Sequence, residues 1–341
     1  MISSPLEPEH VLRIGAVEVV DEVLYDPALL PPVRYPNDHG GDPNFTRDAR
    51  QEARWNRMLE RANVLFGYPK ESSEELARAL ASAPRAHFVQ GTSAGMGAHV
   101  RRAQLPQATL DRVAFASAAG VHAGMLAEFA FHGLLSLRKD AARLARMRAE
   151  RAWLHYPMGE LDGSTIAIVG MGQIGTAIAT RARAFGMRVI GVARTNAPHP
   201  AADLTFATTD IVAAFAQSDA VAITLPMTDK TRGLVDATAL AALRPSAIVV
   251  NVGRGTVLDQ RALTAMLLDG RLAGAVLDVF DPEPLPPDDP LWTLPNVVMS
   301  PHTAALSIHE NARITALFCD NLRRRAAGKP LRNRVNLEEF Y

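Results

Sequence analysis

Between residues 164 and 299, short runs of apolar and β-branched residues alternate with longer segments in which apolar residues recur at helical spacing. This alternation is typical of strand-helix-strand units, whose consecutive strands pair in parallel within one sheet. The runs are mostly continuous, as expected for strands that helices cover on both faces. We therefore predict an α/β fold with a doubly wound parallel sheet. Its strands are expected at 165–169, 188–192, 220–224, 247–251, 273–278 and 297–300.

The residues before this region predict a second, smaller α/β domain, since 341 residues exceed a usual single-domain length. A segment rich in Pro, Gly, Asn and Asp, 31–47, predicts a long surface loop. Because the last predicted helix can run back over the first domain, we expect that domain to be discontinuous. The predicted domains are 1–118 completed by 307–341, and 119–306. Further strands are expected near 13–17, 64–66, 87–90 and 113–116, and helices at 121–137 and 307–327.

The composition favours small partners. The chain carries 36 basic and 36 acidic residues, so nothing draws it toward nucleic acid or anionic lipid. No apolar run reaches the roughly 20 residues that span a bilayer, and we expect no membrane contact. Cys319 is the only cysteine, which excludes an intramolecular disulfide and suits the reducing cytoplasm. We predict no metal site.

A glycine loop follows the first strand of the predicted sheet. Gly170, Gly172 and Gly175 form a G-x-G-x-x-G pattern between an apolar strand and an apolar helix. In that context glycines permit a tight turn, and the amides at the helix start meet the charge of a pyrophosphate. The sequence therefore predicts a dinucleotide-binding domain of the Rossmann type.

The choice of cofactor depends on the end of the second strand. NAD-binding domains usually place an acid there for the adenine ribose, but this chain has Ala193. Arg194 and Thr195 follow, and a guanidinium beside a hydroxyl suits a 2′-phosphate. We expect NADP(H) to be preferred, with NAD(H) possible.

Three polar residues stand just beyond strand ends, where open α/β sheets bind ligands: Arg254, Glu283 and His302. Reduction of a ketone leaves a negative oxygen, so His302 is the expected proton donor. Glu283 would stabilise the imidazolium, and Arg254 would bind a substrate carboxylate and polarise the carbonyl. Asp278 could accept a hydrogen bond from the nicotinamide carboxamide.

With these residues the chain resembles the D-isomer-specific 2-hydroxyacid dehydrogenases, which include glyoxylate/hydroxypyruvate reductases, phosphoglycerate dehydrogenase and formate dehydrogenase. The matching stretches cover almost the whole chain. They are Ser93–Gly97, Val121–Ala123, Ala127–Phe129, Glu160–Gly163, Gly170–Gly175, Asn251–Gly255, Leu277–Pro284, Pro290–Trp292 and Ser300–Ala304.

The resemblance implies that Arg254, Glu283 and His302 are catalytic. It also implies a flavodoxin-like substrate domain, a homodimer built around the cofactor domains, and binding of the substrate carboxylate by backbone amides at Ala94, Gly95 and Met96. The expected cofactor contacts are Gly170, Gly172, Gln173, Ile174, Gly175, Arg194, Thr195, Leu225, Val252, Gly253, Arg254, Asp278, His302 and Ala304.

The chain departs from the family pattern at two positions, and a third position argues against formate as the substrate. Gly97 replaces a usual aspartate and Thr224 a frequent histidine, whereas formate dehydrogenases carry glutamine in place of Glu283. We therefore expect a reductase of a small 2-oxo acid, such as glyoxylate or hydroxypyruvate, that forms the D-2-hydroxy acid. The alternative is a cofactor-sensing binding protein of the corepressor type. An L-specific dehydrogenase is disfavoured, because its glycine loop normally lies near the N-terminus.

Overall fold

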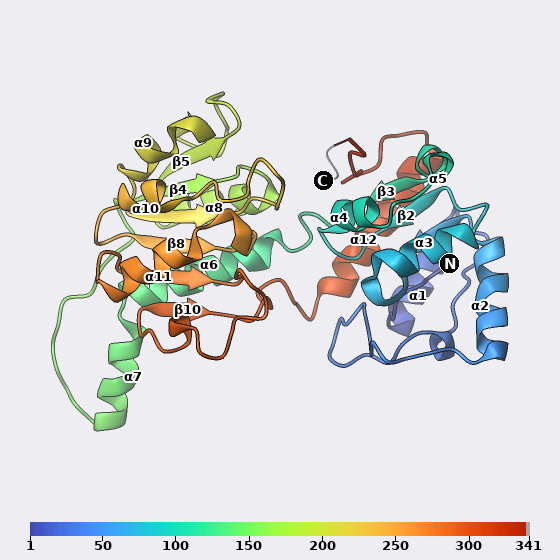
Figure 1. Ribbon diagram of the computed structural model, residues 1–341, viewed down its shortest axis with the longest axis horizontal. Helices are drawn as coiled ribbons and strands as arrows, with labels where there is room; N and C mark the ends of the chain where they lie inside the picture. The colour runs from blue at the N-terminus through green and yellow to red at the C-terminus, as the bar shows by residue number, and fades with distance from the viewer. Residues whose placement is uncertain (339–341) are drawn as a thin grey trace. The chain divides into compact units, whose positions relative to one another are not determined.

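The structure, a computed structural model that describes residues 1–338, divides into two compact units. Unit 1 combines Met1–His122 with Leu306–Tyr341, and unit 2 is Ala123–Ala305. Residues 339–341, at the end of the predicted completing segment, lie outside the described residues. Each unit contains a parallel sheet with helices, as Figure 1 shows, and the predicted α/β class is confirmed.

Unit 2 contains a seven-stranded parallel sheet in the order β10-β9-β8-β7-β4-β5-β6. The order reverses between β4 and β7, which is the point where sheets of this kind bind dinucleotides. The strands are β4 (Thr165–Val169), β5 (Arg188–Ala193), β6 (Leu204–Ala207), β7 (Ala220–Ile223), β8 (Ile248–Asn251), β9 (Gly274–Leu277) and β10 (Val297–Met299).

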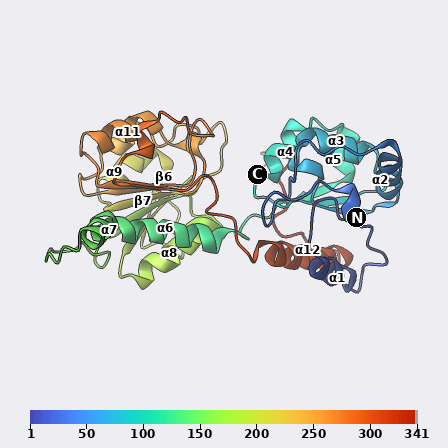
Figure 2. The same ribbon diagram turned by 90° about the horizontal axis from the view of Figure 1, so that it is seen from below.

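Helices cover both faces of this sheet, as Figure 2 shows. One face carries α6 (Ala123–Arg138) and α8 (Gln173–Ala184), and the other carries α9 (Ile211–Phe215), α10 (Ala237–Ala241) and α11 (Gln260–Leu268). The residues of the inner strands β4, β5, β7, β8 and β9 are mostly buried on both faces, which explains their continuous apolar runs, whereas the edge strands β6 and β10 are only partly buried. α7 (Ala141–Glu150) differs, because none of its residues is buried.

Unit 1 is built on a three-stranded parallel sheet in the order β1-β2-β3. Its strands are β1 (Val64–Phe66), β2 (Phe88–Gln90) and β3 (Ala114–Ala116). One face packs against α2 (Ala49–Arg61), α3 (Ser73–Ala81), α4 (Met96–Arg102) and α5 (Gln107–Arg112), and the other against α1 (Pro8–Gly15) and α12 (Glu310–Ala326) (Figure 2). Short 3-10 helices are η1 (Pro27–Leu29), η2 (Pro69–Glu71), η3 (Thr208–Asp210), η4 (Gly255–Val257) and η5 (Pro290–Trp292).

The predicted strand at 13–17 is wrong, because α1 extends over most of it. His10 and Ile14 of α1 are buried four residues apart, which is the repeat of a helix face. The chain that extends the sheet beside β1 is instead Ile2, which forms a parallel bridge with Phe66.

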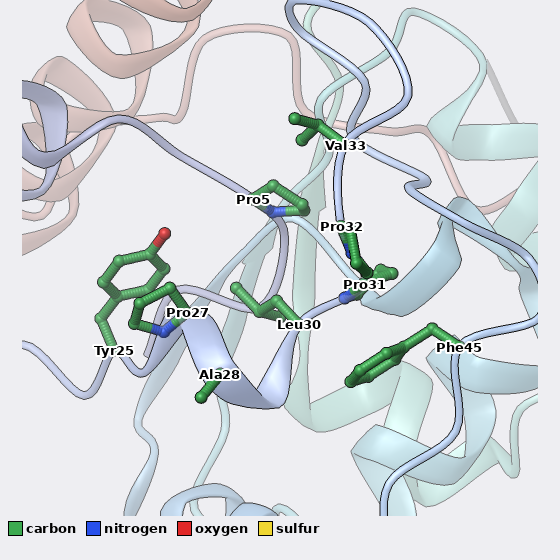
Figure 3. A pocket seen from close by; sticks show the side chains of 9 residues that line it. All are labelled: Pro5, Tyr25, Pro27, Ala28, Leu30, Pro31, Pro32, Val33 and Phe45. Atoms are coloured by element: carbon green, nitrogen blue, oxygen red, sulfur yellow. The ribbon is translucent and has the colours of Figure 1, made fainter.

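The segment 31–47 contains no helix or strand, but the prediction that it lies on the surface is only partly right. Asp38 and His39 within it are 3% and 5% exposed. Pro31 and Phe45 of this loop line a largely apolar pocket of about 400 Å³ together with Tyr25 and Leu30. Figure 3 shows the side chains that line it. Both ends of the loop therefore pack against other residues of unit 1.

No helix within residues 1–338 combines the length and the apolar character that a membrane span requires.

Candidate active site

Arg254, Glu283 and His302 follow β8, β9 and β10, which are neighbours in the sheet of unit 2. Because the strands are parallel, their carboxyl ends meet at one edge, and the three residues lie in adjacent loops there. These loops begin where buried apolar runs end, so the position of each residue follows from the strand that precedes it.

The His302 imidazole is held by Glu283. Nδ1 of His302 donates to Oε2 of Glu283 over 2.9 Å, and the other carboxylate oxygen accepts from the backbone N–H of Phe280 at 2.9 Å. Both side chains remain accessible, 46% for His302 and 35% for Glu283. His302 has a φ of +55°, a left-handed conformation that non-glycine residues adopt at a cost and that is common at functional sites. The pair leaves Nε2 of His302 available to a ligand.

Arg254 is held through the backbone. Its Nη1 donates to the carbonyl of Gly253 at 2.7 Å. The side chain of Asn251 spans the same turn, donating to the carbonyl of Arg254 and accepting from the N–H of Gly253, each at 3.1 Å. Burial lowers the pKa of the Arg254 guanidinium, while the nearby carboxylates of Glu283 and Asp278 raise it. The guanidinium is therefore a partly desolvated cation beside the His302–Glu283 pair.

Asp278 organises the loop that carries His302. Its Oδ1 accepts from Ser300 Oγ at 2.5 Å and from the N–H of Ala304 at 3.0 Å. Its carbonyl accepts from the N–H of His302 at 2.9 Å. The sequence indicated Asp278 as a cofactor contact, but not this structural role, and Ser300 and Asn251 gave no signal of their own.

The glycine loop lies where the strand order reverses. Gly170 has a φ of +103°, and a Cβ there would meet Thr224 Oγ1 at 2.8 Å and Leu225 Cδ2 at 2.9 Å. Thr224 Oγ1 donates to the carbonyl of Gly170 at 2.7 Å and so fixes the turn. Gly172 is the N-cap of α8, and nothing lies within 4 Å of the Cβ position there. The open space before a helix start, where amides lack intrahelical partners, fits a pyrophosphate.

The other predicted cofactor residues of unit 2 lie along the same strand ends. Ala193 ends β5, and Arg194 and Thr195 follow it as exposed residues with no acid at the strand end. Gln173, Ile174 and Gly175 form the first turn of α8. Val252 and Gly253 are buried after β8, and Ala304 is half-buried after β10.

The predicted carboxylate-binding residues lie in unit 1. Gly95 is the N-cap of α4, Ala94 before it is exposed, and the side chain of Met96 is fully buried. Met96 can therefore offer a ligand its backbone but not its thioether.

Comparison with known proteins agrees with this arrangement. The sequence model described as "D-isomer specific 2-hydroxyacid dehydrogenase, NAD binding domain" matches residues 131–304. A glyoxylate reductase of Korarchaeum cryptofilum is 35% identical over 238 residues, which are 68% of this chain and 72% of that protein. Glyoxylate/hydroxypyruvate reductase B of Pectobacterium carotovorum is 43% identical over 224 residues, 62% of this chain and 69% of that protein.

A solved structure resembles the whole chain. It is a D-isomer specific 2-hydroxyacid dehydrogenase from Xanthobacter autotrophicus in complex with NADPH and MES, 26% identical, with a TM-score of 0.74. The match covers 100% of this chain and 98% of that one. Together with the family match over residues 131–304, this shows that the chain belongs to the D-isomer specific 2-hydroxyacid dehydrogenase family.

Proposed function

We propose that the protein is an NADPH-dependent reductase that converts a small 2-oxo acid, of the size of glyoxylate or hydroxypyruvate, into the D-2-hydroxy acid. The observation that carries this proposal is the 2.9 Å pair between His302 and Glu283, next to the partly desolvated cation Arg254. The glyoxylate and hydroxypyruvate reductases among the relatives support the choice of substrate.

A reduced nicotinamide, when bound, supplies a hydride to C2 of the oxo acid. His302 donates the proton that the oxygen on C2 then needs, through Nε2, because Nδ1 is occupied by Glu283. Glu283 orients the ring by its 2.9 Å hydrogen bond with Nδ1. Arg254 binds the substrate carboxylate and polarises the carbonyl, and its partial burial strengthens both interactions. C2 has then gained the hydride and its oxygen the proton, which gives the 2-hydroxy acid.

The residues that would hold the cofactor are the glycine loop and the strand ends beside it. The amides at the start of α8 would bind the pyrophosphate, and Arg194 with Thr195 would bind a 2′-phosphate. Leu225, Val252, Gly253, Asp278 and Ala304 would border the remaining length of the nucleotide.

We assign the substrate-binding role to unit 1, through the backbone amides of Ala94, Gly95 and Met96. We also propose that the protein is a homodimer joined through unit 2. α7 has no buried residue, and after it Trp153 is 91% exposed and Leu154 60%. A helix without a buried face lacks the packing that usually stabilises helices, and large exposed apolar residues mark contact surfaces. A second copy would supply the missing contacts.

Replacing the proposed acid tests the reaction. In His302→Gln, kcat for glyoxylate reduction is expected to fall by about 10²- to 10⁴-fold, because no group of suitable acidity replaces the imidazole. NADPH affinity, measured by fluorescence titration, should stay within about twofold. The exposed His132→Gln is the matched control. Unchanged turnover in His302→Gln rejects the acid role. A wild-type enzyme silent toward a panel of 2-oxo acids would favour a cofactor sensor instead.

The cofactor proposal has its own test. The wild-type enzyme should use NADPH with a higher kcat/KM than NADH. Arg194→Ala should lower kcat/KM for NADPH by about 10- to 100-fold, since a charge-assisted contact to the 2′-phosphate is lost, and leave that for NADH nearly unchanged. A strong preference of the wild type for NADH would refute the proposal.

A further inference from the structure

Unit 1 contains a cluster of polar side chains that the proposed reaction does not use. His122 Nε2 lies 2.9 Å from Oε1 of Glu310, and His39 Nε2 lies 3.9 Å from the same oxygen. Thr92 Oγ1 donates to Oε1 of Glu71 at 2.6 Å, and Glu71 is among the charges that act on His39. We call His39, Glu71, Thr92, His122 and Glu310 the polar cluster.

The polar cluster lies at the carboxyl edge of the sheet in unit 1. Glu71 and Thr92 come after β1 and β2, and His122 comes after β3. This is the edge at which parallel sheets bind ligands. Thr92 also lies two residues before the segment 94–96, which we assign to the substrate carboxylate. The polar cluster and the proposed carboxylate contacts therefore belong to the same end of the same unit.

Two members of the polar cluster are buried with unsatisfied polar atoms. His39 is 5% exposed and Glu310 is 4% exposed. Within residues 1–338, no hydrogen-bond partner is present for either ring nitrogen of His39 or for Oε2 of Glu310. Since buried polar atoms are nearly always hydrogen-bonded, and leaving one unpaired costs about 1–3 kcal/mol, these atoms require a partner that residues 1–338 do not supply.

The backbone at Glu71 adds a second sign of function. Lys70 and Glu71 both have positive φ values, 54° and 47°. Non-glycine residues adopt this conformation at a cost of about 1–3 kcal/mol each, and such residues concentrate at ligand sites. The turn brings the Glu71 carboxylate within hydrogen-bonding distance of Thr92, and Glu71 is half-buried.

The charges define which ligand group fits. Burial lowers the pKa of His39, while the carboxylates of Glu71 and Glu310 raise it and His122 lowers it. Burial being the largest of these effects, His39 is neutral, with one nitrogen that donates and one that accepts. Glu310 can only accept. A hydroxyl group donates and accepts at once. Nε2 of His39 lies 3.9 Å from Oε1 of Glu310, and Oε2 of the same carboxylate is unpaired, so a hydroxyl oxygen about 2.8 Å from His39 Nε2 and from the Glu310 carboxylate fits between them.

Two other ligand groups fit poorly. A second carboxylate would meet the negative charges of Glu71 and Glu310, and a methyl group would leave the buried atoms of His39 unpaired. The polar cluster thus distinguishes neutral hydroxylated groups from both anionic and apolar ones.

We propose that His39 and Glu310 form a specificity site that hydrogen-bonds a hydroxyl group on C3 of the substrate. This inference rests on the proposed function and names its substrate class: 3-hydroxylated 2-oxo acids, preferred over aliphatic ones of equal length. The loop 31–47 supplies the discriminating residue, His39.

The test compares three substrates that differ at C3: hydroxypyruvate, pyruvate, which lacks only the hydroxyl, and glyoxylate, which has no C3. For the wild type, kcat/KM should be at least about tenfold higher for hydroxypyruvate than for pyruvate. In His39→Leu, the value for hydroxypyruvate should fall by about 10- to 100-fold, while those for pyruvate and glyoxylate stay within about threefold. Glu310→Gln, which keeps an acceptor for His122, should shift the ratio in the same direction. The exposed His309→Leu is the matched control.

Each other outcome overturns the inference. Parallel losses for all three substrates in both variants would show that His39 and Glu310 are only structural, with water as their partner. An unchanged ratio of hydroxypyruvate to pyruvate would show that the cluster does not contact C3. Glyoxylate separates the two proposals: reduction of glyoxylate without discrimination at C3 removes the specificity site and keeps the reductase, whereas no reduction of any 2-oxo acid removes both.

Discussion

At the scale of single residues, the loops of unit 2 are held by side chains that bond to backbone atoms. Asp278 fixes the loop of His302, Asn251 fixes the turn of Arg254, and Thr224 fixes the carbonyl of Gly170. None of the three needs to touch a substrate to do so. Each nevertheless sets the position of a residue or loop with a proposed role in binding or catalysis, so small changes at these positions should affect kcat more than stability.

The loop 31–47 depends in a similar way on Asp38. Its carboxylate accepts two hydrogen bonds from the Arg34 side chain, at 2.7 and 2.9 Å, and others from the N–H groups of Arg34 and Gly41, each at 3.0 Å. Burial alone would raise the pKa of Asp38, but these hydrogen bonds outweigh it and lower the pKa to about 2 from a usual 3.8.

Asp38→Asn should therefore destabilise the protein in a pH-dependent way. A lowered folded-state pKa stabilises the fold above the unfolded value of 3.8, and the contribution disappears as the pH falls through about 2. We expect a loss of about 1–2 kcal/mol in the free energy of unfolding at pH 7, and a loss that shrinks below pH 4. Urea titrations across this range measure it, with the exposed Asp21→Asn as control. A loss that does not vary with pH would contradict the assignment.

At the scale of elements, the sequence predicts the helices and strands that have a regular apolar pattern and misses those that lack one. Six strands of unit 2 were identifiable because each reads as an apolar run; in five of them, β4, β5, β7, β8 and β9, the run reflects burial on both faces, whereas the edge strand β10 is only partly buried. β6 was missed because Thr205 interrupts its apolar residues, so this edge strand has no continuous apolar run. The wrong strand at 13–17 has a different cause. A short segment with a few apolar residues can belong to a strand or to the buried face of a helix, and here it belongs to the end of α1.

In the candidate site, too, some residues could be predicted from strand positions and others could not. Arg254, Glu283 and His302 could be placed near one another because the ends of parallel strands meet at one edge. The position of His39 could not be predicted, since it lies in an irregular loop and meets residues far along the chain, such as Glu310 at 3.9 Å. The bonds from Ser300 and Asn251 also have no periodic signal, because they arise from loop conformation rather than from strand register.

α12 is the element whose packing is most open to a direct test. Phe318 on this helix is 3% exposed, and its ring centroid lies 5.1 Å from that of Phe66 and 6.0 Å from that of Phe88. Phe318→Ala should lower the free energy of unfolding by about 3–5 kcal/mol, through lost burial and the cavity left behind. Chemical denaturation monitored by circular dichroism provides the measurement.

Leu317→Ala on the same helix is the control. Leu317 is half-buried, so its truncation should cost about 1 kcal/mol. Equal losses for the two variants would mean that α12 does not stabilise unit 1 through its aromatic contacts.

At the scale of the whole molecule, each unit has hydrophobic clusters on both faces of its own sheet. The chain leaves unit 1 after His122 and returns to it at Leu306. Each unit can therefore bury its own core, and α7 with the residues after it is the part of unit 2 that does not share in this burial. Its exposed apolar residues make association of two chains a testable property of the entire protein.

Trp153→Ser combined with Leu154→Ser should convert a dimer into monomers. A symmetric dimer uses the same surface on both chains, so the two substitutions remove four large apolar side chains from the interface. Light scattering after size-exclusion chromatography should give twice the chain mass for the wild type and a single chain mass for the double variant. Leu268→Ser, at a 58% exposed position of α11, should leave the mass of the dimer unchanged. If the wild type itself elutes as a monomer, the proposed homodimer is wrong. If the double variant stays dimeric, the two chains meet elsewhere.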